Sequence, residues 1–173
     1  GFIMKRVVSN FTGLRISWPA FSAILLLGTL APGPSQTITR IPGLGVPNAT
    51  ATALNDLGQV TGFSIVAETS EQHAFLFSGS EIIDLGVLEG TRSQAVALNN
   101  QGQVVGDSEA VGGYERHPFL YQNGVMTDLG TLGGSFSFAA AINEASQLIA
   151  AVDLYLNKDS QALLYTDRSM IDQ

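Results

Sequence analysis

The sequence predicts an all-β repeat protein, and three observations support this prediction. First, an Ala-x-Ala-Leu-Asn-x-x-Gly segment and its variants recur at a constant step of 44 residues, with their asparagines at Asn55, Asn99 and Asn143 (99 − 55 and 143 − 99). A fixed period of this length is the signature of a repeat architecture. Second, apolar residues within each copy alternate with a period of two, as they do in half-buried strands. Third, Gly, Asn and Ser cluster between these runs at short spacing, which is typical of hairpin turns.

Residues 1–35 are predicted to be a leader. Lys5 and Arg6 follow Met4, which we read as the natural start, and a short apolar run extends from Trp18 to Ala31. A basic start, a short apolar core and small residues at its end are the pattern of a secretory signal peptide. The run is too short to span a bilayer, which takes about 20 residues. We therefore expect a secreted, periplasmic or cell-surface protein whose mature chain has no membrane span; a buried N-terminal helix is the alternative interpretation.

The remaining residues, 36–173, are predicted to form a single repeat domain. The period divides them into units of about 36–79, 80–123 and 124–173, and each unit has the pattern of four short antiparallel strands. In the second unit the strands are expected around Ile82-Ile83, over Ser93–Leu98, from Gln103 to Gly106 and over His117–Tyr121. Glycine-rich links and loops separate the strands, among them Gly112-Gly113 and Gly133-Gly134-Ser135.

Each asparagine segment is predicted to form a tight turn between two strands. In the turn from Asn99 to Gly102, glycine occupies the position that most needs a positive φ angle, and Gly58 holds the same position one period earlier. Ser146 stands there in the third unit, so we expect that turn to be the loosest of the three.

Four strands in about 44 residues match the size of a β-propeller blade. The Ala-x-Ala strands carry the small side chains that an innermost strand requires, and the aromatic-rich strands, such as the one with Phe75 and Phe77, are expected farther out. Propellers close with at least about four blades. We therefore expect a partial toroid, part of a longer protein, that self-associates through its open edges. A β-prism or another closed three-unit β fold is the alternative.

Two kinds of chemically active residue recur with the period. His73 and His117 are the two histidines, and they suit either metal ligands, an acid–base pair, or caps that bond to nearby backbone. The third unit has Gln161 at this position, which favours the structural role. Aspartates precede a Leu-Gly pair at Asp84 and Asp128, and Asp172 keeps their phase. A ring of carboxylates binds cations, but such aspartates more often accept hydrogen bonds from turn N–H groups, and we expect this role.

Composition excludes several classes of function. Three of the eight Lys and Arg residues lie in the leader. Residues 36–173 therefore contain five Lys and Arg and all fifteen Asp and Glu, which gives them a net charge of −10 (5 − 15). Such a domain does not suit nucleic acid, whose phosphates need clustered Lys and Arg. The chain has no cysteine, and it lacks the Gly-x-Ser-x-Gly and Gly-x-Gly-x-x-Gly motifs and a complete calcium loop. The sequence therefore predicts no catalytic residue, no cofactor and no metal.

The motifs resemble the HAF-repeat family of bacterial extracellular proteins. The matching segments are His73-Ala74-Phe75, Asp84-Leu85-Gly86, Asp128-Leu129-Gly130, Thr131-Leu132-Gly133-Gly134, and the Asn-x-x-Gly-Gln-Val-Val-Gly stretch from Asn99 to Gly106. The resemblance covers nearly everything after about residue 36 and implies an extracellular repeat protein, with no established reaction. The third unit departs from it, with Ser146, Ala150 and Gln161 in place of Gly, Gly and His.

Two functions from different classes follow. The first is a noncatalytic binding or structural module that recognises an unknown protein or carbohydrate ligand through its loops. The second, which we rank lower, is a fragment of an extracellular propeller enzyme, either a hydrolase or a lyase, with acids from different units around the channel. An enzyme needs residues that do not repeat, because chemistry is asymmetric, and the most variable segments run from Val66 to Gln72 and from Glu109 to Arg116.

Overall fold

The computed structural model describes residues 38–110, 115–131, 136–154, 159–166 and 169–170. These residues form twelve β-strands and no helix, so the all-β prediction is confirmed. All the strands belong to one compact unit, Thr39–Gln173. The predicted leader, both glycine-rich segments at Gly112-Gly113 and Gly133-Ser135, and Asp172 lie outside the described residues.

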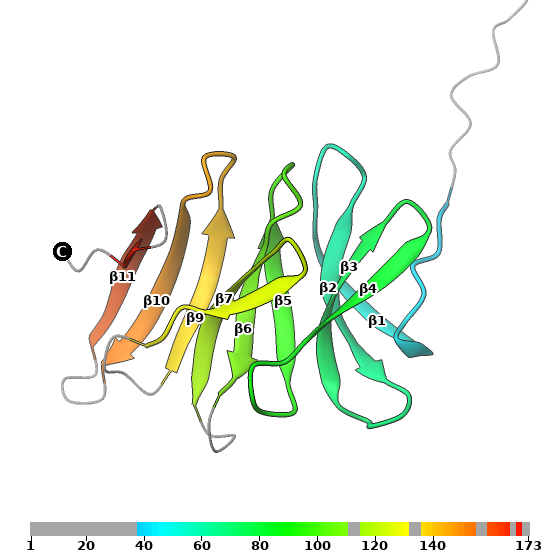
Figure 1. Cartoon of the computed structure of the whole chain (residues 1–173), viewed down its shortest axis with the longest axis horizontal. Coiled ribbons are helices and arrows are strands. Elements are labelled where there is room, and N and C mark those ends of the chain that lie inside the picture. The colour runs from blue at the N-terminus through cyan, green and yellow to red at the C-terminus, as the bar shows by residue number, and fades with distance from the viewer. Residues whose placement is uncertain (1–37, 111–114, 132–135, 155–158, 167–168, 171–173) are drawn as a thin grey trace, which may run out of the picture. The chain divides into compact units, whose positions relative to one another are not determined.

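The strands follow one another as three antiparallel meanders (Figure 1). The first meander consists of β1 (Gly45–Leu54), β2 (Val60–Val66), β3 (Gln72–Ser78) and β4 (Glu81–Gly86). The second consists of β5 (Ser93–Leu98), β6 (Val104–Glu109), β7 (Arg116–Gln122) and β8 (Val125–Asp128). The third consists of β9 (Phe136–Ile142), β10 (Leu148–Leu154), β11 (Asp159–Thr166) and β12 (Ser169–Met170).

Strand pairing joins the meanders into two open sheets. The first meander is a four-stranded sheet, in the order β1-β2-β3-β4. The second sheet has eight strands: seven follow the order β12-β11-β10-β9-β7-β6-β5, and β8 pairs with β7 off this path. One parallel contact, between Arg116 and Phe136, connects β7 to β9. The same contact occurs one period earlier, between Gln72 and Arg92, as an isolated bridge. The two junctions between meanders are therefore alike, although Arg92 lies just before β5 and not within it.

The meanders are out of phase with the units read from the sequence. β4 begins at Glu81, near the start of the second predicted unit, yet it pairs with β3 of the first meander. A repeat has no intrinsic beginning, whereas strand pairing defines one. One period before β4, residues 38–43 form no strand, and the residues one period before β3 lie outside the described part of the chain.

A β-bulge occurs at the same place in each Ala-x-Ala strand. The register shifts by one residue at Thr52, Val96 and Ala140, which are each 44 residues apart. Beside the first bulge, the backbones of β1 and β2 lie so close that a Cβ at Gly62 would be 1.9 Å from the carbonyl oxygen of Thr50. Gly106 meets the same restriction in the second meander, with 2.0 Å to the carbonyl oxygen of Gln94. Bulges of this kind bend and twist a strand.

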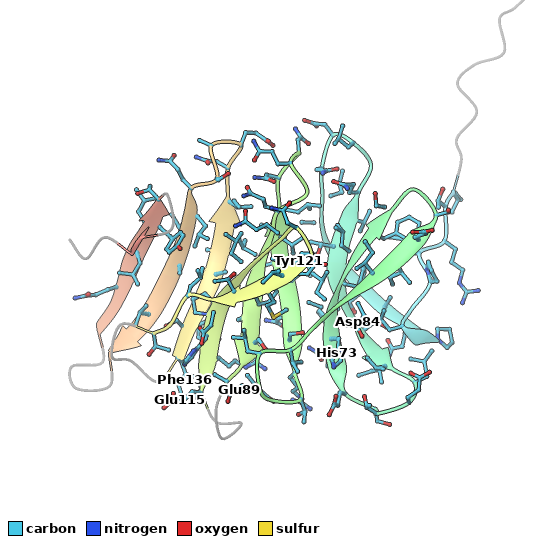
Figure 2. The ribbon with its side chains drawn as sticks, viewed as in Figure 1. His73, Asp84, Glu89, Glu115, Tyr121 and Phe136 are labelled. Carbon is cyan, nitrogen blue, oxygen red and sulfur yellow. The ribbon has the colours of Figure 1, made fainter. Side chains whose placement is uncertain are left out.

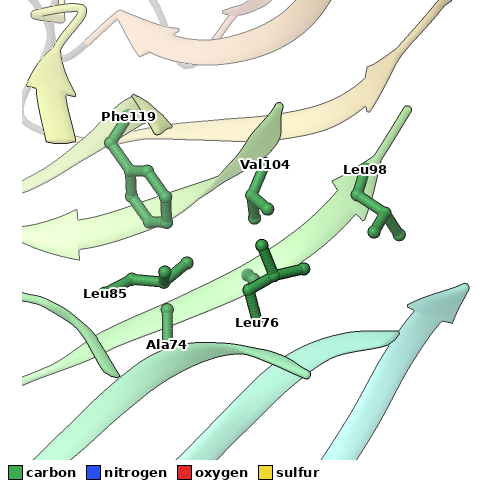
Figure 3. Close-up of a cluster of buried hydrophobic side chains, with 7 residues drawn as sticks. Ala74, Leu76, Leu85, Leu98, Val104 and Phe119 are labelled. Atoms are coloured by element: carbon green, nitrogen blue, oxygen red, sulfur yellow. The ribbon is translucent and has the colours of Figure 1, made fainter. Parts of the chain in front are cut away.

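The hydrophobic core lies between consecutive meanders. One cluster joins β3 and β4 of the first meander to the second (Figure 3), through the buried side chains Ala74, Leu76, Leu85, Ala95, Leu98, Val104 and Phe119. A second cluster joins the second meander to the third, through Val105, Leu120, Leu129, Ala139 and Leu148. The aromatic-rich strands are third in each meander, two strands away from the Ala-x-Ala strand, and they carry the completely buried Phe75 and Phe119.

Candidate functional site

The three repeated asparagines each build the turn that follows their strand. The Oδ1 atom of Asn99 accepts hydrogen bonds from the N–H groups of Gln101 and Gln103, both at 3.1 Å. Asn55 and Asn143 bond in the same way to the residues two and four positions further on. Such bonds from an asparagine side chain to nearby backbone N–H groups stabilise tight turns.

The backbone of these turns is left-handed where the sequence predicted it. Gly58 and Gly102 have φ angles of 74° and 76°, which confirms the prediction for both glycines. Ser146 holds the third position with a φ of 60°, in a region that non-glycine residues adopt at a cost. Its hydroxyl donates to Oε1 of Gln103 at 2.8 Å, so the third turn gains a contact with the second meander.

The same asparagines also link one meander to the next. Nδ2 of Asn55 donates to the backbone carbonyl of Asn99 at 3.0 Å, and Nδ2 of Asn99 donates to the carbonyl of Asn143 at 3.1 Å. Nδ2 of Asn143 donates to Gln147 within its own turn. Asn55 and Asn99 are buried, whereas Asn143 is exposed. We call this series the asparagine ladder; the sequence predicted its turns but not these links.

The residues that follow the ladder are also connected across the junctions. The N–H group of Asp56 donates to Oδ1 of Asn100 at 3.0 Å, and the N–H group of Asn100 donates to the carboxylate of Glu144 at 3.0 Å. Nδ2 of Asn100 returns a bond to Asp56. At each junction a side-chain oxygen of the later meander therefore accepts from the backbone of the earlier one.

The repeated histidines and aspartates form one pair in each of the first two meanders, and Figure 2 shows the first pair. Nδ1 of His73 lies 2.9 Å from Asp84, and Nδ1 of His117 lies 2.8 Å from Asp128. Because an ionised carboxylate can only accept, Nδ1 carries a proton in this arrangement. The expectation that the histidines bond to nearby backbone is therefore wrong: the antiparallel pairing of β3 with β4, and of β7 with β8, places a carboxylate beside each ring.

The aspartates fulfil their predicted role at the same time. Oδ1 of Asp84 accepts from the N–H group of Gly86 at 2.8 Å, and Oδ1 of Asp128 accepts from that of Gly130 at 2.7 Å. Each aspartate thus holds its own turn and an imidazole on the neighbouring strand. In the described part of the chain, no group of three or more His, Asp or Glu side chains is placed to hold a metal ion.

A buried polar cluster in the second meander does not repeat, and sequence reasoning missed it. Asp107 accepts from Arg116 at 2.7 Å and from Nε2 of Gln94 at 3.1 Å, and it is only 1% exposed. Burial raises the pKa of the Asp107 carboxyl above its ordinary value, although the hydrogen bond from Gln94 and the charge of Arg116 oppose this shift. The first meander has Phe63 and the third has Ala151 at the aspartate's position. The signal that could have revealed it is that Asp107 has no counterpart 44 residues earlier or later in the sequence.

An open groove of about 560 Å³ lies on the first meander. It is bordered by the segment that precedes β1 and by the β3–β4 turn, and its lining includes Arg40, Pro42, Val46, Pro47 and Phe77. Its charged group is a guanidinium, which contrasts with the acidic character of the domain.

Comparisons with protein-family models, with curated proteins and with solved structures each find no match to this chain. Among the residues that the structure describes, no helix has the length and apolar character needed to cross a membrane.

Proposed function

We propose that this chain is a secreted or cell-surface β-repeat module with a noncatalytic binding or structural role, related to the HAF-repeat family. We further propose that its meanders are blades of a β-propeller-like partial toroid. The 44-residue step of the sequence, the matching bulges and the asparagine ladder support the repeat. The basic, then apolar, pattern of residues 1–35 supports export.

The observation that supports a noncatalytic role is that the repeated polar side chains make structural contacts. The asparagines hold turns and junctions, the aspartates hold turns, and the histidines hold aspartates on the next strand. These groups stabilise the scaffold. Recognition of a ligand then falls to residues that differ between meanders.

Those residues gather at the strand ends opposite the asparagine turns. The β2–β3 loop, the link between β4 and β5 and the residue before β7 lie there, and they expose Glu68, Glu89 and Glu115 respectively. An acidic surface of this kind favours a ligand with cationic or hydroxyl groups. A basic patch on a protein and a carbohydrate both meet this requirement.

The experiment that tests the proposal is a binding screen of the full chain. A glycan array and a panel of secreted basic proteins are probed with the wild-type chain, and with Glu89→Lys and Glu115→Lys variants. Glu81→Lys is the matched control, because Glu81 is exposed at the opposite strand ends. We expect binding that the first two variants weaken and the control preserves.

A panel of generic hydrolase and lyase substrates tests the enzymatic alternative. Asp107 is a buried carboxylate without a counterpart in the other meanders, so it is the residue to change. Turnover that Asp107→Asn abolishes, in a chain that stays folded, would contradict the noncatalytic proposal.

A further inference from the structure

Equivalent apolar positions of the three meanders differ sharply in exposure. Leu76 and Leu120 are 6% and 5% exposed, whereas Leu164, one period later, is 46% exposed. Thr61 and Val105 are completely buried, whereas Ile149 at the same position is 46% exposed. The first two meanders are covered at these positions by the meander that follows. We call the uncovered surface of the third meander, with Ile149 and Leu164, the trailing face.

The first meander has an uncovered surface of the opposite kind. Leu54 is 74% exposed, whereas its equivalent in the second meander, Leu98, is 8% exposed. Leu98 is buried because it packs with Ala74 and Leu76 of the preceding meander (Figure 3). Ala51 is likewise exposed although Ala95 is completely buried. We call the surface with Ala51 and Leu54 the leading face.

The two faces are complementary because the internal junctions already unite them. Each junction joins the trailing side of one meander to the leading side of the next, as in the cluster of Leu76 with Leu98. The asparagine ladder continues this match. Nδ2 of Asn143 occupies the position from which Nδ2 of Asn99 reaches the next meander, and the carbonyl of Asn55 occupies the position of the acceptor.

We propose that the trailing face of one copy of this chain docks onto the leading face of a second copy. Ile149 and Leu164 then pack around Leu54 of the second copy, and Asn143 donates to the carbonyl of its Asn55. Such a head-to-tail contact uses two different surfaces, so it forms a ring if the rotation closes and a filament if it does not. The described residues of each copy form three meanders, and propellers typically have about four to eight blades. On the propeller proposal, two copies therefore close a ring; the docking itself does not depend on that proposal.

One pair of charges opposes this junction. Inside the chain, Asn100 stands between Asp56 and Glu144 and bonds to both. At the proposed junction the carboxylate of Glu144 meets the carboxylate of Asp56 of the second copy. Association is therefore expected to strengthen at high ionic strength, which screens the repulsion. An Asp56→Asn variant reproduces the carboxylate–amide combination of the internal junctions and is expected to associate more tightly than the wild type.

Sedimentation velocity of the full chain over a hundredfold concentration range tests the proposal. We expect the wild type to associate, and Leu54→Arg and Ile149→Arg each to remain monomeric. An equimolar mixture of these two variants should form a one-to-one dimer, because it contains one intact leading face and one intact trailing face. Val125→Arg is the control, since Val125 is exposed on β8 of the second meander, which contributes to neither face. Circular dichroism establishes that each variant is folded.

The contrary results are distinct. A wild-type chain that stays monomeric throughout the range would overturn the proposal. Association that Leu54→Arg preserves and Ile149→Arg abolishes would show contact between two trailing faces, which also contradicts it. Equal loss with Val125→Arg would show unspecific hydrophobic aggregation.

Discussion

At the junction between the second and third meanders, a proline occupies a position that an alanine occupies at the junction between the first and second, and this difference removes a hydrogen bond. At the first junction, the hydroxyl of Ser93 accepts from the N–H group of Ala74 at 2.8 Å and donates to the carbonyl of Gly86. At the second junction the equivalent hydroxyl, Ser137, is completely buried and has no hydrogen-bond partner among the described residues. The residue equivalent to Ala74 at this junction is Pro118, and because proline has no N–H group it cannot donate to the hydroxyl of Ser137.

Open pockets also lie at the second junction. Two of them, of about 470 and 390 Å³, are lined by Leu120 and Gln122 of the second meander and Tyr165 of the third. Pro118 of the second meander thus leaves the buried hydroxyl of Ser137, in the third, without a partner among the described residues. Because neighbouring meanders share one interface, a substitution on either side of it reduces the stability of both meanders.

The largest expected effect on stability comes from a comparison of two leucines, one buried at the first junction and one on the trailing face. Leu76→Ala should destabilise the chain by about 2–5 kcal/mol, because it removes a buried leucine from the first junction. Leu164→Ala should cost less than about 1 kcal/mol, since Leu164 is half-exposed. Urea unfolding at low protein concentration measures both, and equal losses would contradict the assignment of the trailing face.

The asparagine ladder provides the next comparison. Asn99→Ala should cost about 3 kcal/mol, because it removes bonds to Asn143 and to two turn N–H groups at a buried position. Asn143→Ala should cost about 1 kcal/mol, since water can replace the bonds of an exposed asparagine. Thermal melts of the two variants decide the question, and a larger loss for Asn143→Ala would refute the link between meanders.

The two serines test the difference between the junctions directly. Ser93→Ala should cost about 1–3 kcal/mol, because it leaves the buried N–H group of Ala74 without an acceptor. Ser137→Ala should be neutral or slightly stabilising, since it removes a buried hydroxyl that has no partner within the described residues. A clear destabilisation by Ser137→Ala in denaturant unfolding would show that its hydroxyl is bonded after all.

The tight turns allow a smaller and more local test. Gly102→Val should cost about 1–2 kcal/mol, because a β-branched residue is strained at a positive φ angle. A Cβ at Gly102 would lie 3.7 Å from its nearest neighbour, so steric overlap does not contribute. Gly124→Val, at a φ of 81° in a different turn, is a matched control and should show a similar loss. Unchanged melting of Gly102→Val would count against the turn.

The smallest expected effect concerns pH and the buried aspartate. Burial raises the pKa of Asp107, so the folded state binds this proton more tightly than the unfolded state does. Its contribution to stability is therefore complete below its ordinary pKa of 3.8 and is lost as the pH rises through the raised value. The stability of the wild type relative to Asp107→Asn should fall across this window. A difference in unfolding free energy between the wild type and Asp107→Asn that stays constant at all pH values would contradict the prediction.

The sequence by itself determined the strand content, the period and the tight turns of this protein. These features depend on neighbouring residues. The φ angles of Gly58 and Gly102 follow from a turn a few residues long, and the bond from Gly86 to Asp84 spans two residues. Alternation of apolar residues likewise predicts a strand without knowledge of its partner.

Only the tertiary structure decided which groups meet across strands and across junctions. The pairing of His73 with Asp84 needed the register of β3 on β4, and the bond from Asn55 to Asn99 needed the stacking of two meanders. Leu120 and Leu164 are the same residue at the same phase, yet one is buried and the other is half-exposed. Burial depends on what covers a side chain, and the sequence of a repeat does not specify whether a neighbour is present on each side.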